Sequence, residues 1–424
     1  MSEKLTIEGF AGLKKVSIDL RKINLFIGPQ ATGKSVVAKL LHLLKSIPAF
    51  LLAGATQGMA KGRLYKVCLA RFEQCFPVST WGEAPFFVHY ECGDVFVKIR
   101  KTPAKTAGVT LSCSTYYGDV LRGLRDLSDA IGRQPAEAQA IAGLVTPRMH
   151  RELSRLATER GMPQFYFHQV FIDAGRSFFA NVQQNVFRMI SADATLDPFL
   201  REFGAYYERC RDFVFGRNGR PRTPRNRADR EIDRLVEEIL GARCAVKGEQ
   251  DVLEFPDGRV VDIGHVSSGQ QETHPLAVIL QGVLIEQPLA NGKTLYIEEP
   301  EAHLFPVTQR RVVELLATVY NADPVRSQLV VTTHSPYILT ALNNLLQAGR
   351  LAGELGGNAS ALKRLHRVVP KTRLLSAGDV SAYYFDGMTA RSIMTDDGLI
   401  EAAEIDSVSE DLAIQFGKIL DIGG

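Results

Sequence analysis

The segment that most constrains the fold of this 424-residue chain is GPQATGKS, at residues 28–35. It fits the pattern G-x-x-x-x-G-K-[ST], in which glycines let backbone N–H groups wrap around phosphates. The apolar, strand-like runs KKVSIDL and INLFI precede it, and SVVAKLLHLLKSI, with apolar residues at helical spacing, follows it. Strand, glycine loop and helix are the context in which this motif binds phosphate at a helix N-terminus.

This loop predicts a site for ATP and Mg²⁺. Lys34 should reach the β- and γ-phosphates, and the hydroxyl of Ser35 should ligate Mg²⁺. Taken alone, the motif leaves open a tight glycine turn that binds nothing. The predicted nucleotide-binding residues of the loop are Gly28, Pro29, Gln30, Ala31, Thr32, Gly33, Lys34, Ser35 and Val36.

A second half-site lies far along the chain, where TLYIEE is followed by PEAHLFP. An apolar strand that ends in two carboxylates is a Walker B pattern. We expect Glu298 to help hold Mg²⁺ and Glu299 to polarise the attacking water as the catalytic base. Two buried, adjacent acids are costly without a cation or a proton, which argues against a merely structural role.

A third strand-like run, QLVVTTHSP, ends in His334. Open α/β sheets bind ligands at the carboxyl edge of parallel strands, and a strand here would deliver His334 to that edge. We therefore predict that His334 contacts the γ-phosphate and belongs with Lys34 and Glu299 to the catalytic residues.

Between these half-sites lies VSSGQQE, followed by a helical apolar pattern. A Ser-Ser-Gly-Gln entry to a helix offers hydroxyls and free N–H groups to an anion, although it equally suits a simple N-cap. The informative feature is the order along the chain: P-loop, Ser-Gly-Gln helix, Walker B and then histidine.

In that order, GPQATGKS, VSSGQQE, LYIEEPEAH and VVTTHSP together resemble the ABC-type ATPases. The resemblance implies an α/β fold: an ATPase head built on a mixed sheet with flanking helices. It also implies a head-to-tail dimer that sandwiches two ATPs, with the signature acting on the partner's nucleotide. An AAA+ ATPase is disfavoured because it leaves VSSGQQE without a role. The predicted signature residues are Ser267, Ser268, Gly269 and Gln270.

Within that group, SSGQQE, EEPEAHLFP and FIDAGRSFF look like the OLD-like ATPases of bacterial anti-phage defence. Arg176 matches a characteristic arginine of such a segment, near the nucleotide or the dimer face. Gln183 or Gln184 is the candidate for a transporter's Q-loop glutamine. A transporter subunit is excluded, because 235 residues separate Lys34 from Gly269. Long heptad arrays of the SMC kind are missing from the sequence.

The motifs divide the chain into head segments and two insertions. We predict head segments at 1–47 (with the P-loop), 161–191 and 251–424. The insertion at 48–160 should hold antiparallel strands and helices, and the insertion at 192–250 should be helical with an Arg-rich loop. The 90 residues after His334 contain no Asp-x-Asp, so we expect no Toprim nuclease in this chain.

Charge is uneven along the chain. Its net charge is +3, yet residues 209–234 carry nine arginines against four acids, so this stretch alone is +5. Gly216, Gly219, Pro221 and Pro224 argue against regular structure at its centre. The stretch is either a solvated loop or a basic arm for nucleic acid or an acidic protein.

Composition and the N-terminal sequence indicate the cellular compartment. Six cysteines without a CxxC pair suit reduced thiols, and MSEKLTIEGF has no stretch of signal-peptide length, so we expect a cytoplasmic protein that does not bind membranes.

Three functions fit these observations. The first is an ATP-dependent sensor and scaffold of phage defence. It assembles with itself into a dimer or a higher oligomer, as in PARIS systems, holds a separate Toprim nuclease effector and answers a phage-encoded trigger. The second is a RecF/SMC-like repair ATPase that binds duplex DNA through residues 209–234. The third is an interaction module with a degenerate nucleotide site.

Overall fold

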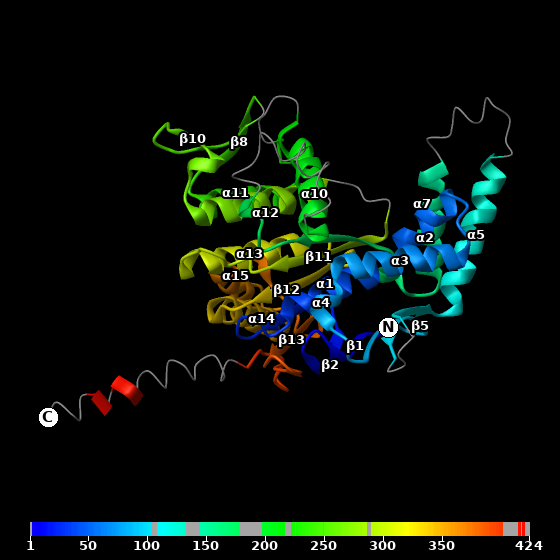
Figure 1. The fold of residues 1–424 in the computed structure, drawn as a ribbon. Coiled ribbons are helices and arrows are strands. Elements are labelled where there is room, and N and C mark those ends of the chain that lie inside the picture. The colour runs from blue at the N-terminus through cyan, green and yellow to red at the C-terminus, as the bar shows by residue number, and fades with distance from the viewer. Residues whose placement is uncertain are drawn as a thin grey trace.

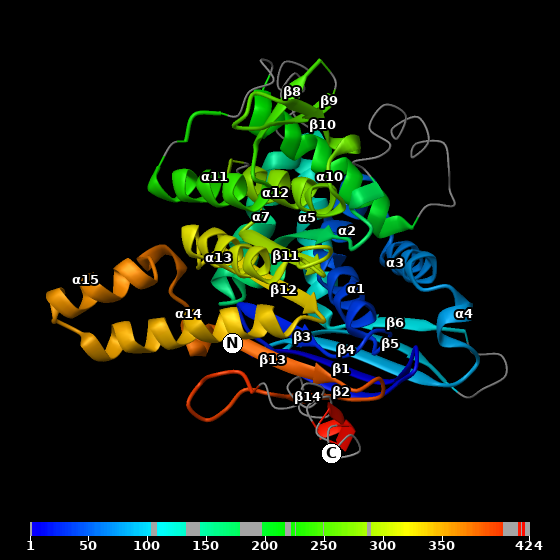
Figure 2. The same cartoon turned by 90° about the vertical axis from the view of Figure 1, so that its left-hand side faces the viewer.

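The computed structural model describes residues 2–102, 108–132, 145–178, 197–216, 222–224, 226–248, 250–285, 290–401, 414–416 and 418–419. These residues form an α/β head built on a six-stranded sheet, with a five-stranded and a three-stranded sheet beside it (Figures 1 and 2). The predicted fold class is therefore confirmed.

The six-stranded sheet has the order β14-β13-β3-β12-β11-β7. Its neighbours pair in parallel except β14, which runs antiparallel to β13. The P-loop strand β3 thus lies between two strands from the last quarter of the chain. The bounds are β3 (Ile23–Ile27), β7 (Phe167–Ile172), β11 (Gly292–Glu298), β12 (Ser327–Thr333), β13 (Val380–Phe385) and β14 (Ala390–Ser392).

Both faces of this sheet are buried, because alternate side chains of each strand enter two different cores. On β11, Leu295 and Ile297 join the core that contains α10–α14, whereas Tyr296 joins the core that contains α1 and α2. On β7, Ile172 and Phe171 divide in the same way. This alternation explains why the central strands are continuous apolar runs, and it sets which face each strand's terminal residue occupies.

The five-stranded sheet is antiparallel, with the order β2-β1-β4-β5-β6. Its first two strands come from the predicted head segment 1–47, and the other three come from the predicted insertion 48–160. The antiparallel strands expected in the insertion are present, but they extend a sheet that the N-terminus begins. The bounds are β1 (Glu3–Phe10), β2 (Leu13–Leu20), β4 (Phe86–Cys92), β5 (Val95–Lys101) and β6 (Thr110–Cys113).

The three-stranded sheet leads into the signature helix. Strands β9 (Gln250–Glu254) and β10 (Val260–Asp262) form a hairpin around a Pro-Asp-Gly turn, and β8 (Arg243–Lys247) pairs with the other side of β9. A short 3-10 turn, Ile263–His265, then connects this sheet to α12.

Helices cover both faces of the central sheet. One side carries α1 (Lys34–Lys45), α2 (Ile47–Thr56), α3 (Lys61–Cys75), the short α4 (Val78–Trp81), α5 (Thr115–Gly132) and α7 (Val145–Glu159). The other carries α10 (Pro198–Phe215), α11 (Arg227–Leu240), α12 (Ser268–Ile285), α13 (Pro306–Ala322), α14 (Pro336–Leu355) and α15 (Ala359–Val368). In Figure 1, α10, α11 and α12 lie together beside the small sheet, and α5 and α7 pair at the opposite end.

One stretch, Lys34–Thr56, is long and apolar enough to cross a membrane by composition alone. It contains the P-loop helix α1 and packs into the protein, with 67% of its most apolar window buried. The six cysteines are all free thiols.

The Arg-rich stretch is shorter as a loop than the sequence indicated. Helix α10 continues to Phe215 and α11 begins at Arg227, so only the residues between them connect the two helices. Arg211 on α10 pairs with Asp251, and Arg234 on α11 pairs with Glu231 and Glu238. The predicted Gln183 and Gln184 lie outside the described residues.

Candidate functional site

The P-loop connects β3 to α1 through two positions that only glycine suits. At Gly28, with φ +150°, an added Cβ would lie 2.2 Å from the carbonyl oxygen of Phe385 on β13. At Gly33, with φ +91°, it would lie 2.7 Å from Leu13 Cδ2. The loop is thus pressed between two neighbouring strands, and this close approach explains its glycines.

Lys34 folds back into the loop. Its ammonium donates to the carbonyl oxygens of Gly28 (2.8 Å) and Pro29 (2.6 Å) and to Oγ1 of Thr32 (3.3 Å). Burial lowers the pKa of Lys34 to about 8, against the opposing charges of Glu299 and Glu301. The carbonyl oxygens of the loop therefore bind the Lys34 ammonium at the place where the P-loop motif predicts a bound phosphate.

Glu298 ends β11 as a buried acid, only 4% exposed. One carboxylate oxygen, Oε2, accepts from the backbone N–H of Ala174 at 3.3 Å, and Oε1 has no hydrogen-bond partner among the described residues. Burial and then the charge of Asp173 raise the pKa of Glu298, whereas Lys39 and the Ser35 hydroxyl act in the opposite direction. A buried carboxylate oxygen without a partner, beside a hydroxyl, suits a hard divalent cation, so Ser35 and Glu298 fit the Mg²⁺ predicted for them.

Glu299 and His334 lie together at the carboxyl edge of the sheet. Nε2 of His334 is 2.9 Å from Oε1 of Glu299, and Nδ1 is 3.4 Å from Nζ of Lys34. An ammonium can only donate and a carboxylate only accepts, so this arrangement assigns the ring proton to Nε2. The structure therefore brings together the three residues predicted to be catalytic.

The backbone at Glu299 holds it in an uncommon conformation. Its φ is +43°, in the left-handed region, and its N–H donates to the carbonyl of Thr332 at 2.9 Å. Such strain costs about 1–3 kcal/mol in a non-glycine residue and is concentrated at functional sites. The turn redirects the chain, so that Glu298 and Glu299 take different contacts although they are adjacent.

Glu301 is a site residue that the sequence analysis missed. Its Oε1 accepts from Oγ1 of Thr333 at 2.6 Å and from the backbone N–H of His334 at 2.8 Å. This carboxylate thus fixes the end of β12 to the Walker B segment. The spacing E-E-P-E was the available signal, but only the neighbouring position of β11 and β12 shows what the third acid does.

The signature residues open α12. The N–H and hydroxyl of Ser267 donate to Oε1 of Gln270 at 3.1 and 3.0 Å, which is a local capping arrangement. Ser267 and Ser268 are exposed, whereas Gly269 is buried against the backbone of His303. No hydrogen bond or ion pair connects these four residues to the P-loop of the same chain within the described ranges.

Arg176 does not face the nucleotide loop. It is fully buried, and its guanidinium donates to the carbonyl oxygens of Glu272 (2.9 Å), Glu298 (2.7 Å) and Glu299 (2.8 Å), with a longer bond to Asp173 (3.2 Å). The sequence predicted that Arg176 lies near the nucleotide or the dimer face. Its guanidinium bonds to backbone carbonyls, two of them in the Walker B residues, and a direct contact with the nucleotide stays a prediction. The guanidinium instead ties the start of the signature helix to the Walker B turn.

One comparison with protein families matches residues 121–340, about half of the chain, to a family described as "AAA domain, putative AbiEii toxin, Type IV TA system". The match covers the signature, Walker B and His334. The chain belongs to this family. The AbiEii-like membership supports an ATPase of the AAA/ABC type with a nucleotide site. Its description uses the word AAA, which the sequence analysis had disfavoured in the sense of AAA+. A comparison with curated proteins finds no match.

Among solved structures, the chain is similar to heads of SMC proteins. The SMC head domain from Thermotoga maritima is 12% identical, with 80% of this chain and 91% of that chain covered at a TM-score of 0.36. An SMC head bound to the C-terminal winged-helix domain of ScpA is 14% identical, with 92% and 97% covered and a TM-score of 0.41. The SMC head of Pyrococcus furiosus with an extended coiled coil, bound to the C-terminal domain of ScpA, is 13% identical, with 97% and 99% covered and a TM-score of 0.39. Scores this low support no inference about activity or partners.

Proposed function

We propose that the chain binds and hydrolyses ATP between two head-to-tail copies of itself, as sensor and scaffold of an anti-phage defence system. The observation that carries the enzymatic part is the chain of contacts from Lys34 through His334 to Glu299. In this proposal Lys34 is the cation that binds phosphate, His334 is an imidazole that can change partners, and Glu299 is the carboxylate base that hydrolysis of a terminal phosphate requires.

The mechanism starts with the Lys34 ammonium bonded to the carbonyl oxygens of its own loop. The phosphates of ATP take the place of the carbonyls of Gly28 and Pro29 as partners of the Lys34 ammonium. His334 leaves Lys34 and turns its Nε2–H from Glu299 to the γ-phosphate, because a phosphate oxygen can only accept a hydrogen bond. Glu299 accepts a proton from the attacking water, while the loop N–H groups and Lys34 stabilise charge on the phosphate oxygens. Mg²⁺ bound with ATP would be held by Ser35 and Glu298 and would neutralise phosphate charge.

The dimer is supported by the position of the signature. Ser267 and Ser268 are exposed and, among the described residues, form no hydrogen bond or ion pair with their own P-loop, so they are accessible to the nucleotide of a partner. Large apolar side chains are exposed close by: Phe305 is 75% exposed and Val307 is 59% exposed. They follow the segment 303–304, which packs against Gly269. Burying such side chains against a second copy would stabilise the closed dimer.

The defence role rests on the resemblance of SSGQQE, EEPEAHLFP and FIDAGRSFF to the OLD-like ATPases, and on a family description that names a toxin of a TA system. In size and motifs the chain resembles AriA of PARIS systems. We infer that it acts in the cytoplasm, holds a separate Toprim nuclease like AriB and releases it when a phage-encoded trigger is sensed. A Toprim reading frame beside its gene, and co-purification of the two proteins, would support this role.

Phosphate release by the purified protein tests the enzymatic part. Lys34→Ala should abolish ATP binding or turnover. Glu299→Gln should retain ATP binding, lose turnover and accumulate a dimer with ATP in size-exclusion chromatography. If Glu299→Gln hydrolyses ATP at the wild-type rate, the assignment of the base is wrong. If the wild type neither binds nor hydrolyses ATP, alone or with its partner, the chain is an interaction module with a degenerate site.

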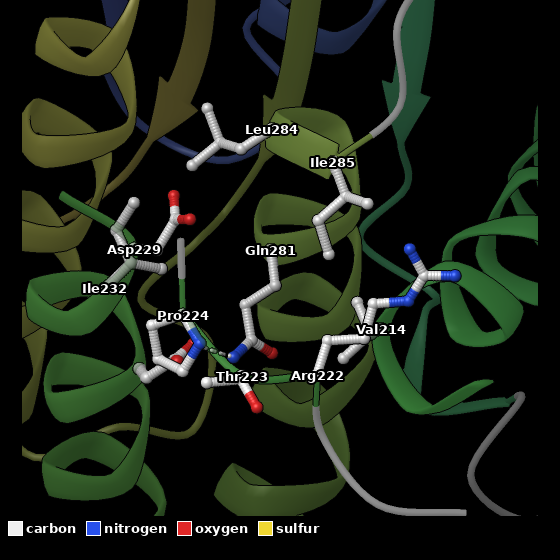
Figure 3. Close-up of a pocket in the computed structure, with 10 residues that line it drawn as sticks. Val214, Arg222, Thr223, Pro224, Asp229, Ile232, Gln281, Leu284 and Ile285 are labelled. Carbon is white, nitrogen blue, oxygen red and sulfur yellow. Dashed lines mark hydrogen bonds between the residues drawn. The ribbon is translucent and has the colours of Figure 1, made fainter. Parts of the chain in front are cut away.

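The alternative function is a RecF/SMC-like ATPase that binds duplex DNA through residues 209–234. The observation that favours it is that Arg222, Arg227 and Arg230 are exposed and form no ion pair among the described residues. Figure 3 shows Arg222, Thr223 and Pro224 lining a small pocket against α12, where Gln281 donates to Asp233 at 2.7 Å. The C-terminal part of the Arg-rich stretch is thus hydrogen-bonded to α12 of the head.

Duplex binding separates the two functions. Phosphate contacts by these arginines would give binding at low salt that weakens steeply toward physiological salt. Arg227→Glu with Arg230→Glu should remove that binding and leave ATP hydrolysis intact. If the protein fails to bind duplex DNA even at low salt, the alternative is rejected.

A further inference from the structure

Asp173 lies at the end of β7, directly beside the end of the Walker B strand. Strands β7 and β11 pair in parallel, and their last register pair joins Ile172 to Ile297. Asp173 and Glu298 are therefore the next residues at the same level, on strands about 4.8 Å apart. Phe171 and Tyr296, two positions earlier on each strand, both pack in the core that contains α1. Because side chains alternate along a strand, Asp173 and Glu298 also belong to the α1 face.

Helix α1 presents two matching groups to this pair of acids. Ser35 and Lys39 are four residues apart, so they lie on the same face of the helix. The hydroxyl of Ser35 interacts with the carboxylate of Glu298, while Nζ of Lys39 lies 3.7 Å from Oδ2 of Asp173. Lys39 also pairs with Asp197 at 3.2 Å. One lysine thus serves two carboxylates, and Glu298 keeps an oxygen without a partner.

The carboxylates of Asp173 and Glu298 are not both compensated by Lys39. Glu298 is almost fully buried, and Oε1 has no donor among the described residues. Oδ1 of Asp173 accepts a hydrogen bond from the N–H of Gly175 at 2.8 Å, so Oδ2 is the oxygen that faces Lys39. The carboxylates of Asp173 and Glu298 and the hydroxyl of Ser35 therefore lie on the same face of the sheet, and Oε1 of Glu298 has no partner among the described residues. Such oxygen atoms are the donors that a hard divalent cation prefers.

We propose that Asp173 is a ligand of the metal ion of the nucleotide site, and that with Ser35 and Glu298 it supplies three oxygen donors from this chain. The inference rests on the proposed function. The inference goes beyond that function, because the sequence indicated only a neutral glutamine, Gln183 or Gln184, as the Q-loop candidate. A carboxylate in that place adds a negative charge, so the site should bind a divalent cation before ATP arrives, with Lys39 then paired to Asp197.

Manganese binding to the full-length protein tests this proposal. Mn²⁺ substitutes for Mg²⁺ at oxygen ligands, and its EPR signal reports free and bound ion without any turnover. The wild type should bind Mn²⁺ without nucleotide, and Asp173→Asn should weaken that binding roughly tenfold or more, since even outer-shell partners of ligands contribute about 10- to 100-fold. Asp173→Glu, which keeps the carboxylate, should retain binding that Asp173→Asn loses.

Asp197→Asn is the matched control. It removes the other carboxylate that contacts Lys39, and its amide oxygen can still cap α10 through the N–H of Phe199. The proposal predicts unchanged Mn²⁺ affinity in this variant. If Asp173→Asn and Asp197→Asn bind Mn²⁺ as tightly as the wild type, Asp173 is not a ligand.

A nucleotide titration in EDTA separates this inference from the proposed function. A fluorescent ATP analogue should bind the wild type and Asp173→Asn with equal affinity when metal is removed. A wild type that binds no nucleotide either in EDTA or with Mg²⁺ would overturn the ATPase proposal, whereas equal nucleotide binding with unchanged Mn²⁺ affinity would overturn only the role of Asp173. Melting temperatures of the variants, measured in parallel, identify any variant that fails to fold; Asp173→Glu then carries the comparison.

Discussion

Nε2 of His334 donates to Oε1 of Glu299 across 2.9 Å, so the imidazole fixes the orientation of the carboxylate that we propose as the base. In the proposed mechanism, His334 is therefore a positioning residue for the base as well as a contact for the γ-phosphate. His334→Ala should lower the rate of hydrolysis by at least about 10²-fold, the lower end of general-base contributions. Nucleotide affinity should change far less. His334→Gln, which can still donate to Glu299, should recover part of the rate; single-turnover kinetics measure both.

The second prediction concerns the pH dependence of stability. Burial lowers the pKa of Lys34 to about 8 from 10.5 in the unfolded chain. Between these values the unfolded chain binds more protons than the folded one, so the free energy of unfolding of the ATP-free protein should rise with pH across this window. Urea unfolding at pH 7.5, 8.5 and 9.5 measures the slope. Lys34→Met should flatten it, and an identical slope in this variant would contradict the assignment.

Arg176 should be the most important single side chain for the stability of the site. Arg176→Ala leaves the carbonyls of Glu272, Glu298 and Glu299 without their donor and should lower the free energy of unfolding by about 3–5 kcal/mol. Arg176→Lys should recover little, because an ammonium cannot reproduce the fork. Arg234→Ala, which removes exposed helical ion pairs, is the control and should cost less than about 1 kcal/mol.

Glu301 should act on catalysis through the end of β12. Glu301→Ala removes the acceptor for Thr333 and for the N–H of His334, so the imidazole loses its fixed position. Hydrolysis should fall by about tenfold or more, the cost of losing about 1.4 kcal/mol of positioning. Glu301→Gln keeps an acceptor oxygen and should retain most activity. Equal loss in both variants would show that the charge, not the acceptor, matters.

Phe305 should be needed for ATP-dependent dimerisation. In the Glu299→Gln background, Phe305→Asp should prevent the ATP-bound dimer, because it places a charge where an apolar surface is to be buried. Val325→Asp is a control of similar exposure, at 76%, located between α13 and β12. Light scattering with and without ATP distinguishes the two. A dimer that survives Phe305→Asp would place the interface elsewhere.

The sequence predicted the parts of the site that are contained in single motifs. Lys34, Glu298, Glu299 and His334 each follow an apolar run, and parallel strands bring the ends of such runs to one edge. Asp173 also follows an apolar run, FHQVFI. Its meaning depends on β7 lying next to β11, and strand order cannot be derived from a local pattern.

The remaining differences have the same origin. A buried arginine and a surface arginine look alike in a sequence, so the contacts of Arg176 with backbone carbonyls could not be foreseen. Strands β1 and β2 pair between adjacent segments, whereas the pairing of β1 with β4 across an intervening helical segment is a long-range contact that a local pattern does not reveal. The extent of the Arg-rich loop was overestimated because Arg211 and Arg234 are helical residues with local or buried acid partners.

The place of β3 has a consequence for how the protein is made. Ile23 pairs with Leu329 on one side and with Val380 on the other, more than 300 residues later in both cases. A ribosome that adds about 5–20 residues per second therefore exposes both edges of this apolar strand for tens of seconds before its neighbours exist. The five-stranded sheet, complete by Cys113, can form early, whereas the ATPase sheet must close late and across long loops. The nascent chain should accordingly depend on chaperones that shield unpaired strand edges.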